Sequence, residues 1–414
     1  MKNNPLSFLL IQLVVLLLFF QACQKRSISD SNVSEKSAAI EKEVDIPPSE
    51  GYGVNEELAV FVAKRFANDH FGKRSDHIQM KGSGQKEVEH VLVKTNAVGD
   101  TVAYLINYEE KGFAVIPADQ RVQPVLAFSE QNKMPLSFDV ALPGGLKGWL
   151  KDVTQAIDSL QSHTVKGKNN YNKHPGWVSF TSESLRAKEP IDPPGGGDCE
   201  DEIIEKGPLL QTEWGQDEGY NNKIDNYNCS TTVNGKPLTG CVATAIAQVV
   251  RYHEYPNYVN YGIMPDDSIF AYQQPTGTNE VATLMDDAGK TTFTDWGCNA
   301  STAYTNDIPY SLEGFFGYSS SVDVQDYDRN DVMSEIDASR PVILRGDDGG
   351  STGHAWVADG YRDVYDCSGG YGYLFFHMNW GWEGAYNGLY SFDDFTPGSS
   401  NYNSDKKQVV GIKP

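Results

Sequence analysis

The feature that most constrains the fold is a break in the middle of the chain. Between His163 and Lys206 the sequence has neither helical nor strand periodicity. Its centre reads Pro193-Pro194-Gly195-Gly196-Gly197 and continues into an acidic run. This composition is typical of an exposed, flexible segment, where proteases cleave chains. The pattern therefore predicts two domains, at residues 51–163 and 206–414, joined by a flexible, cleavable linker over residues 164–205.

Size and charge narrow the classes of partner. The 414 residues include 34 Lys and Arg against 56 Asp and Glu, a formal net charge of −22. A phosphate backbone would approach against the average field of the molecule, so we expect no nucleic acid partner. Hydrophobic residues make up 39% of the chain and aromatic residues 11%, which is sufficient to fill two cores.

The N-terminus predicts export. Lys2 precedes an apolar run at residues 8–20, which is shorter than the roughly 20 residues of a membrane-spanning helix. Residues 1–22 are therefore interpreted as a signal peptide, and Ala22-Cys23 resembles the lipobox of bacterial lipoproteins. The resemblance implies that Cys23 is lipidated, that residues 23–50 form a lipid-anchored flexible tether, and that the protein is an outer membrane or cell surface lipoprotein, released or not after processing. Ordinary secretion without a lipid is the alternative.

The first domain has the pattern of a small α+β unit. Apolar residues recur at helical spacing from Glu56, and a second helix is predicted from Gly145. Four short apolar runs between these helices are typical of strands, at residues 91–95, 102–108, 112–117 and 122–128.

The second domain contains a candidate nucleophile. Residues 239–253 predict a mostly buried helix that Thr239 or Gly240 can cap, which leaves Cys241 in the first turn. Free backbone N–H groups and the helix dipole favour negative charge there, so the Cys241 thiol is biased towards the reactive thiolate. From position alone, a small buried cysteine packed among alanines remains the alternative.

A cysteine nucleophile needs a base, and three histidines are candidates. His253 lies 12 residues along the same helix, about 18 Å from Cys241, which is too far. His354 begins an apolar strand pattern after a Gly-rich loop, and His377 is a second candidate, on one strand face with Asn379. The order Cys, His, Asn is that of papain-like proteases, in which the Asn amide orients the imidazole.

These residues also carry a family resemblance. Four blocks resemble, in the same order, the streptopain family of secreted bacterial cysteine proteases: Trp214-Gly215-Gln216, Gly240-Cys241-Val242-Ala243-Thr244-Ala245 with Gln248, Gly353-His354-Ala355 with Asp359-Gly360, and Asn379-Trp380-Gly381-Trp382. Residues 112–119 and 125–129 resemble the propeptide of that family. The chain departs from the family pattern at residues 219–221 and in a longer segment at 363–373.

The resemblance implies a fold and a set of roles. The expected fold is α+β: a papain-like cysteine protease domain, with a helix-bearing half and an antiparallel sheet half, preceded by a small α+β propeptide domain. Cys241 is expected to be the nucleophile and His354 the general base and acid. Asn379 is expected near the imidazole, Trp380 as its shield, and Gln216 as an oxyanion donor.

The expected function follows from these roles. The chain is interpreted as an exported cysteine endopeptidase, made as a zymogen whose residues 51–163 inhibit it. It would act on proteins or peptides and require neither metal nor organic cofactor. Two alternatives stay open: a surface interaction lipoprotein or inhibitor on a protease fold, and an amidase or transpeptidase with the same nucleophile. The pairing of the four other cysteines is also left open: Cys199, Cys229, Cys298 and Cys367.

Overall fold

The computed structural model describes residues 51–72, 86–164, 172–180, 202–232, 234–268, 275–347, 353–366, 370–392 and 406–414. The predicted signal peptide, the tether and Cys23 lie outside these residues, as do Cys199 and Cys367. Within the described ranges, no helix combines the length and apolar character needed to span a membrane.

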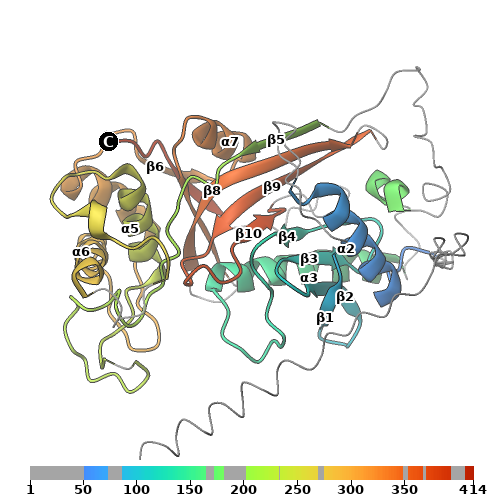
Figure 1. Cartoon of the computed structure of the whole chain (residues 1–414), viewed down its shortest axis with the longest axis horizontal. Helices are drawn as coiled ribbons and strands as arrows, with labels where there is room; N and C mark the ends of the chain where they lie inside the picture. The colour runs from blue at the N-terminus through green and yellow to red at the C-terminus, as the bar shows by residue number, and fades with distance from the viewer. Residues whose placement is uncertain are drawn as a thin grey trace, which may run out of the picture. The chain divides into compact units, whose positions relative to one another are not determined.

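The N-terminal domain is an antiparallel meander between two helices (Figure 1). Along β2, alternate residues serve the two faces: Ile106 packs in the core around α2, and Leu105 packs in the core around α3. The elements are α2 (Glu56–His70), β1 (Val88–Thr95), β2 (Thr101–Tyr108), β3 (Phe113–Pro117), β4 (Ala127–Ser129) and α3 (Gly144–Thr164). Of the predicted strand at residues 122–128, only the end is a strand.

The C-terminal domain has a helical half and a sheet half, which confirms the predicted α+β class. In the helical half α5 packs against α6, with buried residues such as Ile246 and Leu284 in one core. The elements are β5 (Glu202–Lys206), α5 (Cys241–His253), η2 (Tyr261–Ile263), α6 (Pro275–Thr291), η3 (Thr305–Asp307), η4 (Tyr310–Phe315), β6 (Asp323–Asp326), α7 (Arg329–Asp337), β7 (Val342–Asp347), β8 (Gly353–Asp366), β9 (Tyr371–Asn379), β10 (Gly388–Tyr390) and β11 (Lys407–Val410).

The two domains share one antiparallel sheet. Its strand order is β1-β2-β3-β4-β10-β9-β8-β7-β11-β6, and β5 pairs with β8 beside that path. The joint is the pairing of β4 with β10, where Phe128 faces Leu389 and Ala127 faces Tyr390. The N-terminal strands therefore extend the sheet of the C-terminal domain directly.

The N-terminal helices also cover the C-terminal part of this sheet. On one face, Trp149 of α3 contacts Tyr390, and its Nε1–H donates to the Ser391 carbonyl at 2.6 Å. On the other face, Phe66 of α2 packs edge-on against Phe128 of β4, which packs edge-on against Phe375 of β9, with ring centroids 5.0 and 5.1 Å apart. The two predicted domains thus have common cores. The sequence did not predict this, because its periodicity shows which face of an element is apolar but not which element covers that face.

Parts of the predicted flexible linker, residues 164–205, are folded. The 3-10 helix η1 (Pro175–Phe180) buries Trp177, whose Nε1–H donates to the Val122 carbonyl at 2.7 Å. Strand β5 pairs with β8 from Glu202 to Lys206. These two elements were not predicted, because η1 is a 3-10 helix of only six residues and the sequence of β5 does not alternate apolar and polar residues.

Candidate active site

The candidate nucleophile lies at the start of helix α5. Gly240 precedes the helix at a φ of 88°, a conformation that favours glycine, and Cys241 is the first helical residue. The Thr239 N–H donates to the Gln216 carbonyl at 2.9 Å, which fixes the entry of the chain into the helix next to Gln216. From Val242 to Val250 the helix is buried, as its apolar sequence predicts.

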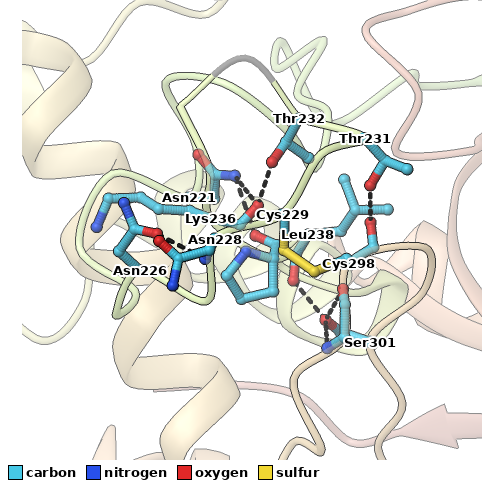
Figure 2. Close-up of a disulfide and its surroundings, with 12 residues drawn as sticks. Asn221, Asn226, Asn228, Cys229, Thr231, Thr232, Lys236, Leu238, Cys298 and Ser301 are labelled. Atoms are coloured by element: carbon cyan, nitrogen blue, oxygen red, sulfur yellow. Dashed lines mark hydrogen bonds between the residues drawn. A yellow bond between two sulfur atoms is a disulfide. The ribbon is translucent and has the colours of Figure 1, made fainter.

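A disulfide joins the segment before this helix to a second loop (Figure 2). Cys229 is bonded to Cys298, a pairing that the sequence left open. The Thr231 hydroxyl donates to the Cys298 carbonyl at 2.9 Å, and the Ser301 hydroxyl donates to the Leu238 carbonyl at 2.6 Å. Among the described residues, Cys241 is the free cysteine.

Four of the five predicted site residues line one cavity of about 760 Å³ between the two halves. The nucleophile helix contributes Cys241 and the sheet contributes His354. Gln216, Trp380 and Trp382 line the same cavity, together with residues 299–306 and the beginning of α3. Within the described part of the chain, no group of three or more His, Cys, Asp and Glu side chains is arranged to hold a metal ion.

The surroundings of Cys241 oppose ionisation in this state. Burial raises the pKa of the Cys241 thiol above its usual value, and hydrogen bonds from the backbone N–H groups of Ala355, Val242 and Cys241 only partly offset this. The Ala355 N–H donates to Sγ at 3.4 Å. The net direction is opposite to the thiolate bias predicted from the helix terminus alone, because the sequence does not show that the site is covered.

Helix α3 lies against His354. Trp356 packs in the core around α3, whereas Ala355 and Val357 pack in the core around α5. His354, two residues before Trp356 on β8, therefore points to the α3 face. A Cβ built on Gly144 would overlap its imidazole ring. The hydrogen bond described for the Cys241 thiol is the one that Sγ accepts from the Ala355 N–H.

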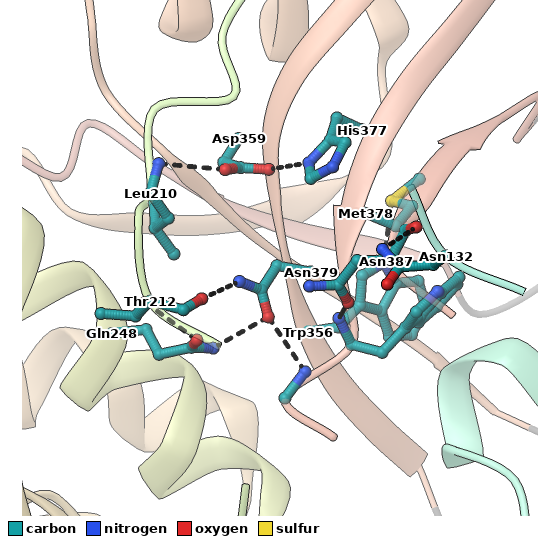
Figure 3. A network of polar contacts seen from close by, with 12 residues as sticks. Asn132, Leu210, Thr212, Gln248, Trp356, Asp359, His377, Met378, Asn379 and Asn387 are labelled. Atoms are coloured by element: carbon teal, nitrogen blue, oxygen red, sulfur yellow. Dashed lines mark hydrogen bonds and ion pairs between the residues drawn. The ribbon is translucent and has the colours of Figure 1, made fainter. Parts of the chain in front are cut away.

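Asn379 is paired with Val357, which packs in the core around α5, so it lies on the sheet face opposite His354. Figure 3 shows Asn379 beside Thr212 and Gln248. Its Nδ2–H donates to the Thr212 carbonyl at 2.7 Å. Its Oδ1 accepts from Gln248 Nε2 at 3.3 Å and from the Gly381 N–H at 3.2 Å. These bonds tie Asn379 to α5 and to the segment before it. The predicted contact of this amide with the imidazole is not among them.

The sequence did not predict that Gln248 is a hydrogen-bond partner of Asn379. Gln248 is fully buried in α5, and its Oε1 accepts from the Thr212 hydroxyl at 2.9 Å while its amide N–H donates to Asn379. The only sequence signal was the position of Gln248 within the family block.

The two other candidate bases lie elsewhere. His377 Nδ1 is 2.6 Å from Asp359 Oδ1, and the buried Asp359 also accepts from the Leu210 N–H at 3.0 Å (Figure 3). His377 does not line the cavity. His253, at the far end of α5, is 3.1 Å from the Tyr318 hydroxyl, and burial lowers its pKa to about 4.

Trp380 closes the cavity towards the sheet. Its Nε1–H donates to the Tyr386 carbonyl at 3.1 Å, and its ring packs against Trp356 and Tyr390 at 5.3 and 5.1 Å. A Cβ on Gly145 would lie 2.6 Å from Trp356 and 2.7 Å from Trp380. The Gly144-Gly145 pair therefore allows α3 to approach both the imidazole and the two indoles.

A nucleophile helix and a sheet that face each other across a cavity, with an N-terminal domain inserted against it, define the class of papain-like cysteine protease with its propeptide. The peptidase C10 family model matches residues 214–264 and 257–390, and the Spi protease inhibitor model matches residues 54–157. The chain therefore belongs to the peptidase C10 family of cysteine proteases and carries a propeptide inhibitor domain ahead of the protease domain.

Individual relatives are similar to this chain over most of its length. Streptopain from Streptococcus pyogenes serotype M28 is 25% identical over 391 residues, which cover 80% of this chain and 87% of streptopain. Thiol protease/hemagglutinin PrtT from Porphyromonas gingivalis is 24% identical over 405 residues, 85% of this chain and 41% of that protein. A solved prointerpain A fragment from Prevotella intermedia is 26% identical with a TM-score of 0.55, covering 80% of this chain and 99% of the fragment.

The raised pKa of Cys241 gives a testable difference between precursor and mature forms. Because only the thiolate is alkylated and burial disfavours it, the pH midpoint for iodoacetamide labelling of Cys241 in the precursor will lie above the ordinary cysteine value of about 8.5. Removal of the propeptide will lower the midpoint, since the start of α3 lines the same cavity as Cys241 and its loss opens that cavity further to solvent. Labelling rates are measured against pH by peptide mapping, which separates Cys241 from the other cysteines.

Both the precursor and the mature form carry His354→Ala. Neither form then processes itself, and no thiolate–imidazolium pair affects the labelling of Cys241. A trace of active protease generates the mature form. A precursor midpoint equal to or below that of the mature form contradicts the prediction.

Proposed function

We propose that the chain is the zymogen of an endopeptidase in which Cys241 is the nucleophile and His354 the general base and acid. One observation carries the proposal: Cys241, at a helix N-terminus, and His354, at the start of a strand in the other half, line the same cavity. Membership of a cysteine protease family supports the same roles.

The proposed reaction is acyl transfer to water. Cys241 Sγ attacks the carbonyl carbon of a peptide bond, and His354 gives a proton to the leaving amine nitrogen as the C–N bond breaks. A water molecule, deprotonated by the same imidazole, then attacks the thioester, which releases the carboxylic acid and regenerates the thiol. The backbone N–H of Cys241 and the amide of Gln216 would stabilise the oxyanion, by about 3 kcal/mol each.

Two further residues have proposed positioning roles. Trp380 would screen the reacting pair from water, which its buried indole beside the cavity supports. Asn379 would have a structural role, because its hydrogen bonds to Thr212 and Gln248 would fix the sheet half relative to the nucleophile helix. We propose that this network, and not a contact with the imidazole, keeps Cys241 and His354 in register in the precursor.

The contacts of α3 support a steric mode of inhibition. Gly144 lies against the imidazole and Gly145 against the indoles of Trp356 and Trp380, so the propeptide occupies the His354 side of the cavity. Residues 51–163 would be the inhibitory unit, and 206–414 the catalytic domain. We place the activating cleavage between Phe180 and Glu202, because the chain is packed in η1 before this interval and paired in β5 after it.

The proposed location is outside the cytoplasm. Residues 1–22 would be the signal peptide, Cys23 the lipidated residue and residues 23–50 the tether of an outer membrane or cell surface lipoprotein. Cleavage in the linker would release the catalytic domain from this anchor.

Exposed aromatic rings at the cavity support a substrate preference. Phe293 is 67% exposed and Tyr304 is 81% exposed, and both line the cavity. Phe293 adopts a φ of 52°, which is costly for a bulky residue, and it stacks on Tyr310 at 5.5 Å. We propose that these rings contact apolar side chains of the polypeptide substrate.

The proposed roles are tested first with the nucleophile and the two histidines. The chain from residue 24 onwards will shorten with time and degrade casein, whereas Cys241→Ala and His354→Ala will do neither, with losses of about 10³-fold or more. His377→Gln will keep most of the activity, since His377 pairs with Asp359 away from the cavity. Size is followed by gel electrophoresis and casein loss by fluorescence. If Cys241→Ala behaves like the unchanged chain, the result favours the alternative function, a surface interaction lipoprotein or inhibitor on a protease fold.

The glycine pair at the start of α3 provides a test of inhibition. Gly144→Ala adds a Cβ that the imidazole leaves no room for, so we expect the lag before self-processing to shorten about fivefold, equivalent to about 1 kcal/mol of lost contact energy. Gly53→Ala, with no atom within 4 Å of the added Cβ, is the control. If helix propensity alone mattered, Gly144→Ala would strengthen α3 and lengthen the lag; that result contradicts the mechanism.

The aromatic rings are tested on the mature enzyme. Phe293→Asn removes the ring but tolerates the positive φ, so we expect KM for a peptide with apolar side chains to rise about tenfold, with kcat nearly unchanged. KM for a matched peptide with polar side chains should change little. Tyr365→Asn, an exposed aromatic near the far end of β8, is the control. An equal change of KM for both peptides argues against the preference.

A further inference from the structure

The disulfide holds together two loops at one end of the helical half. Cys229 lies in the segment that leads into α5, and Cys298 lies 69 residues later, in the loop after α6. We call residues 295–306 the clamped loop. Cys229 is buried, and Cys298 is partly exposed. The bond thus fixes a surface loop to the chain that positions the nucleophile.

Hydrogen bonds close the clamped loop on itself and onto the α5 segment. Asp295 and Thr302 exchange two backbone hydrogen bonds, at 2.8 and 3.0 Å. The Leu238 N–H donates to the Gly297 carbonyl at 3.3 Å, and the Leu238 carbonyl accepts from Ser301. Figure 2 shows the Cys229–Cys298 bond beside this contact. Without the disulfide, the two hydrogen bonds of Leu238 and the hydrogen bond of Thr231 would hold the clamped loop to the segment before α5.

The clamped loop is one wall of the cavity that contains Cys241. Residues 299–306 line this cavity, and Asn299, Ala300 and Thr302 are exposed there. A neighbouring cavity of about 300 Å³ is lined by Cys298 itself and shares Leu238 and Asn299 with the first. The disulfide therefore lies beside the second cavity, close to the residues that the two cavities share.

We propose that the Cys229–Cys298 disulfide is a positioning element for substrate binding. It holds the wall formed by the clamped loop at a fixed place relative to Cys241, so that an extended polypeptide binds a preformed surface. An unclamped loop would have to be ordered on binding, which weakens affinity but leaves the reacting groups unchanged. The proposal rests on the proposed roles of Cys241 and His354.

The disulfide and the nucleophile then require opposite redox states. Cys241 acts as a thiolate and must stay reduced, whereas the clamp must stay oxidised. A dithiol such as dithiothreitol reduces the clamp by supplying two electrons and two protons to the sulfurs of Cys229 and Cys298 and becomes a cyclic disulfide itself. Low dithiol concentrations would therefore maintain activity, and high concentrations would lower it by raising KM.

The test uses the mature enzyme and the double variant Cys229→Ala with Cys298→Ala. We expect KM for an extended peptide substrate to rise about tenfold while kcat stays within about twofold. Circular dichroism and active-site titration check that both proteins are folded. An unchanged KM, or a fall in kcat at unchanged KM, overturns the proposal.

A second readout separates positioning from general damage to the site. Iodoacetamide is too small to contact the wall formed by the clamped loop. Its rate of reaction with Cys241 should therefore be the same in the mature enzyme and in the double variant. A peptidyl chloromethyl ketone binds along the wall, and its rate should fall by the same factor as kcat/KM. An equal fall with both reagents would mean that the nucleophile itself is disturbed, which contradicts the proposal.

The unmodified mature enzyme provides a test that does not depend on the folding of the variant. Its KM should rise as dithiothreitol reduces the Cys229–Cys298 bond, followed by peptide mapping, and should recover on reoxidation. A KM that does not follow the state of this bond overturns the proposal. If Cys241→Ala retains activity, the proposed function fails instead, whatever the effect of the dithiol.

Discussion

The structure depends on one buried polar junction between its halves. Asn379 extends from the sheet and Gln248 from the nucleophile helix, and both meet the segment at Thr212 that precedes the helix. Buried amides are costly unless they are paired, so this junction specifies one relative placement of the halves. A two-part active site needs such a constraint, because Cys241 and His354 lie on separate elements that a small shift would uncouple.

The propeptide uses the same sheet in a different way. It adds strands at the β10 edge and covers both faces of β8 and β9, so that inhibition and packing are performed by one domain. The close approach of α3 requires Gly144 and Gly145, since any side chain there would meet His354 or Trp380. A single helix position therefore places α3 against His354, Trp356 and Trp380, in the cavity that Cys241 also lines.

The sequence predicted individual helices and strands and the class of protein better than it predicted how these elements pack against one another. Periodicity and the Gly240 cap placed the helix that begins at Cys241, and the order of the blocks predicted the family. Alternation along β8 and β9 could not show that Asn379 faces α5 while His354 faces α3, because the strand register was unknown. The Cys229–Cys298 pair was equally hidden, since composition does not reveal which cysteines meet. The folded parts of the linker were missed because η1 is only six residues long and β5 does not alternate apolar and polar residues.

The clamp and the propeptide act on different walls of one cavity. The start of α3 lies against His354 and Trp380, and residues 299–306 of the clamped loop form another part of the cavity wall. In the proposed mechanism, removal of α3 would uncover His354, while the Cys229–Cys298 bond would keep the clamped loop in place. A covalent bond suits this wall, because the protease is expected to work outside the cytoplasm, where disulfides persist. Under these proposals, the binding surface would be fixed during folding, and the reactive groups would be uncovered later by cleavage.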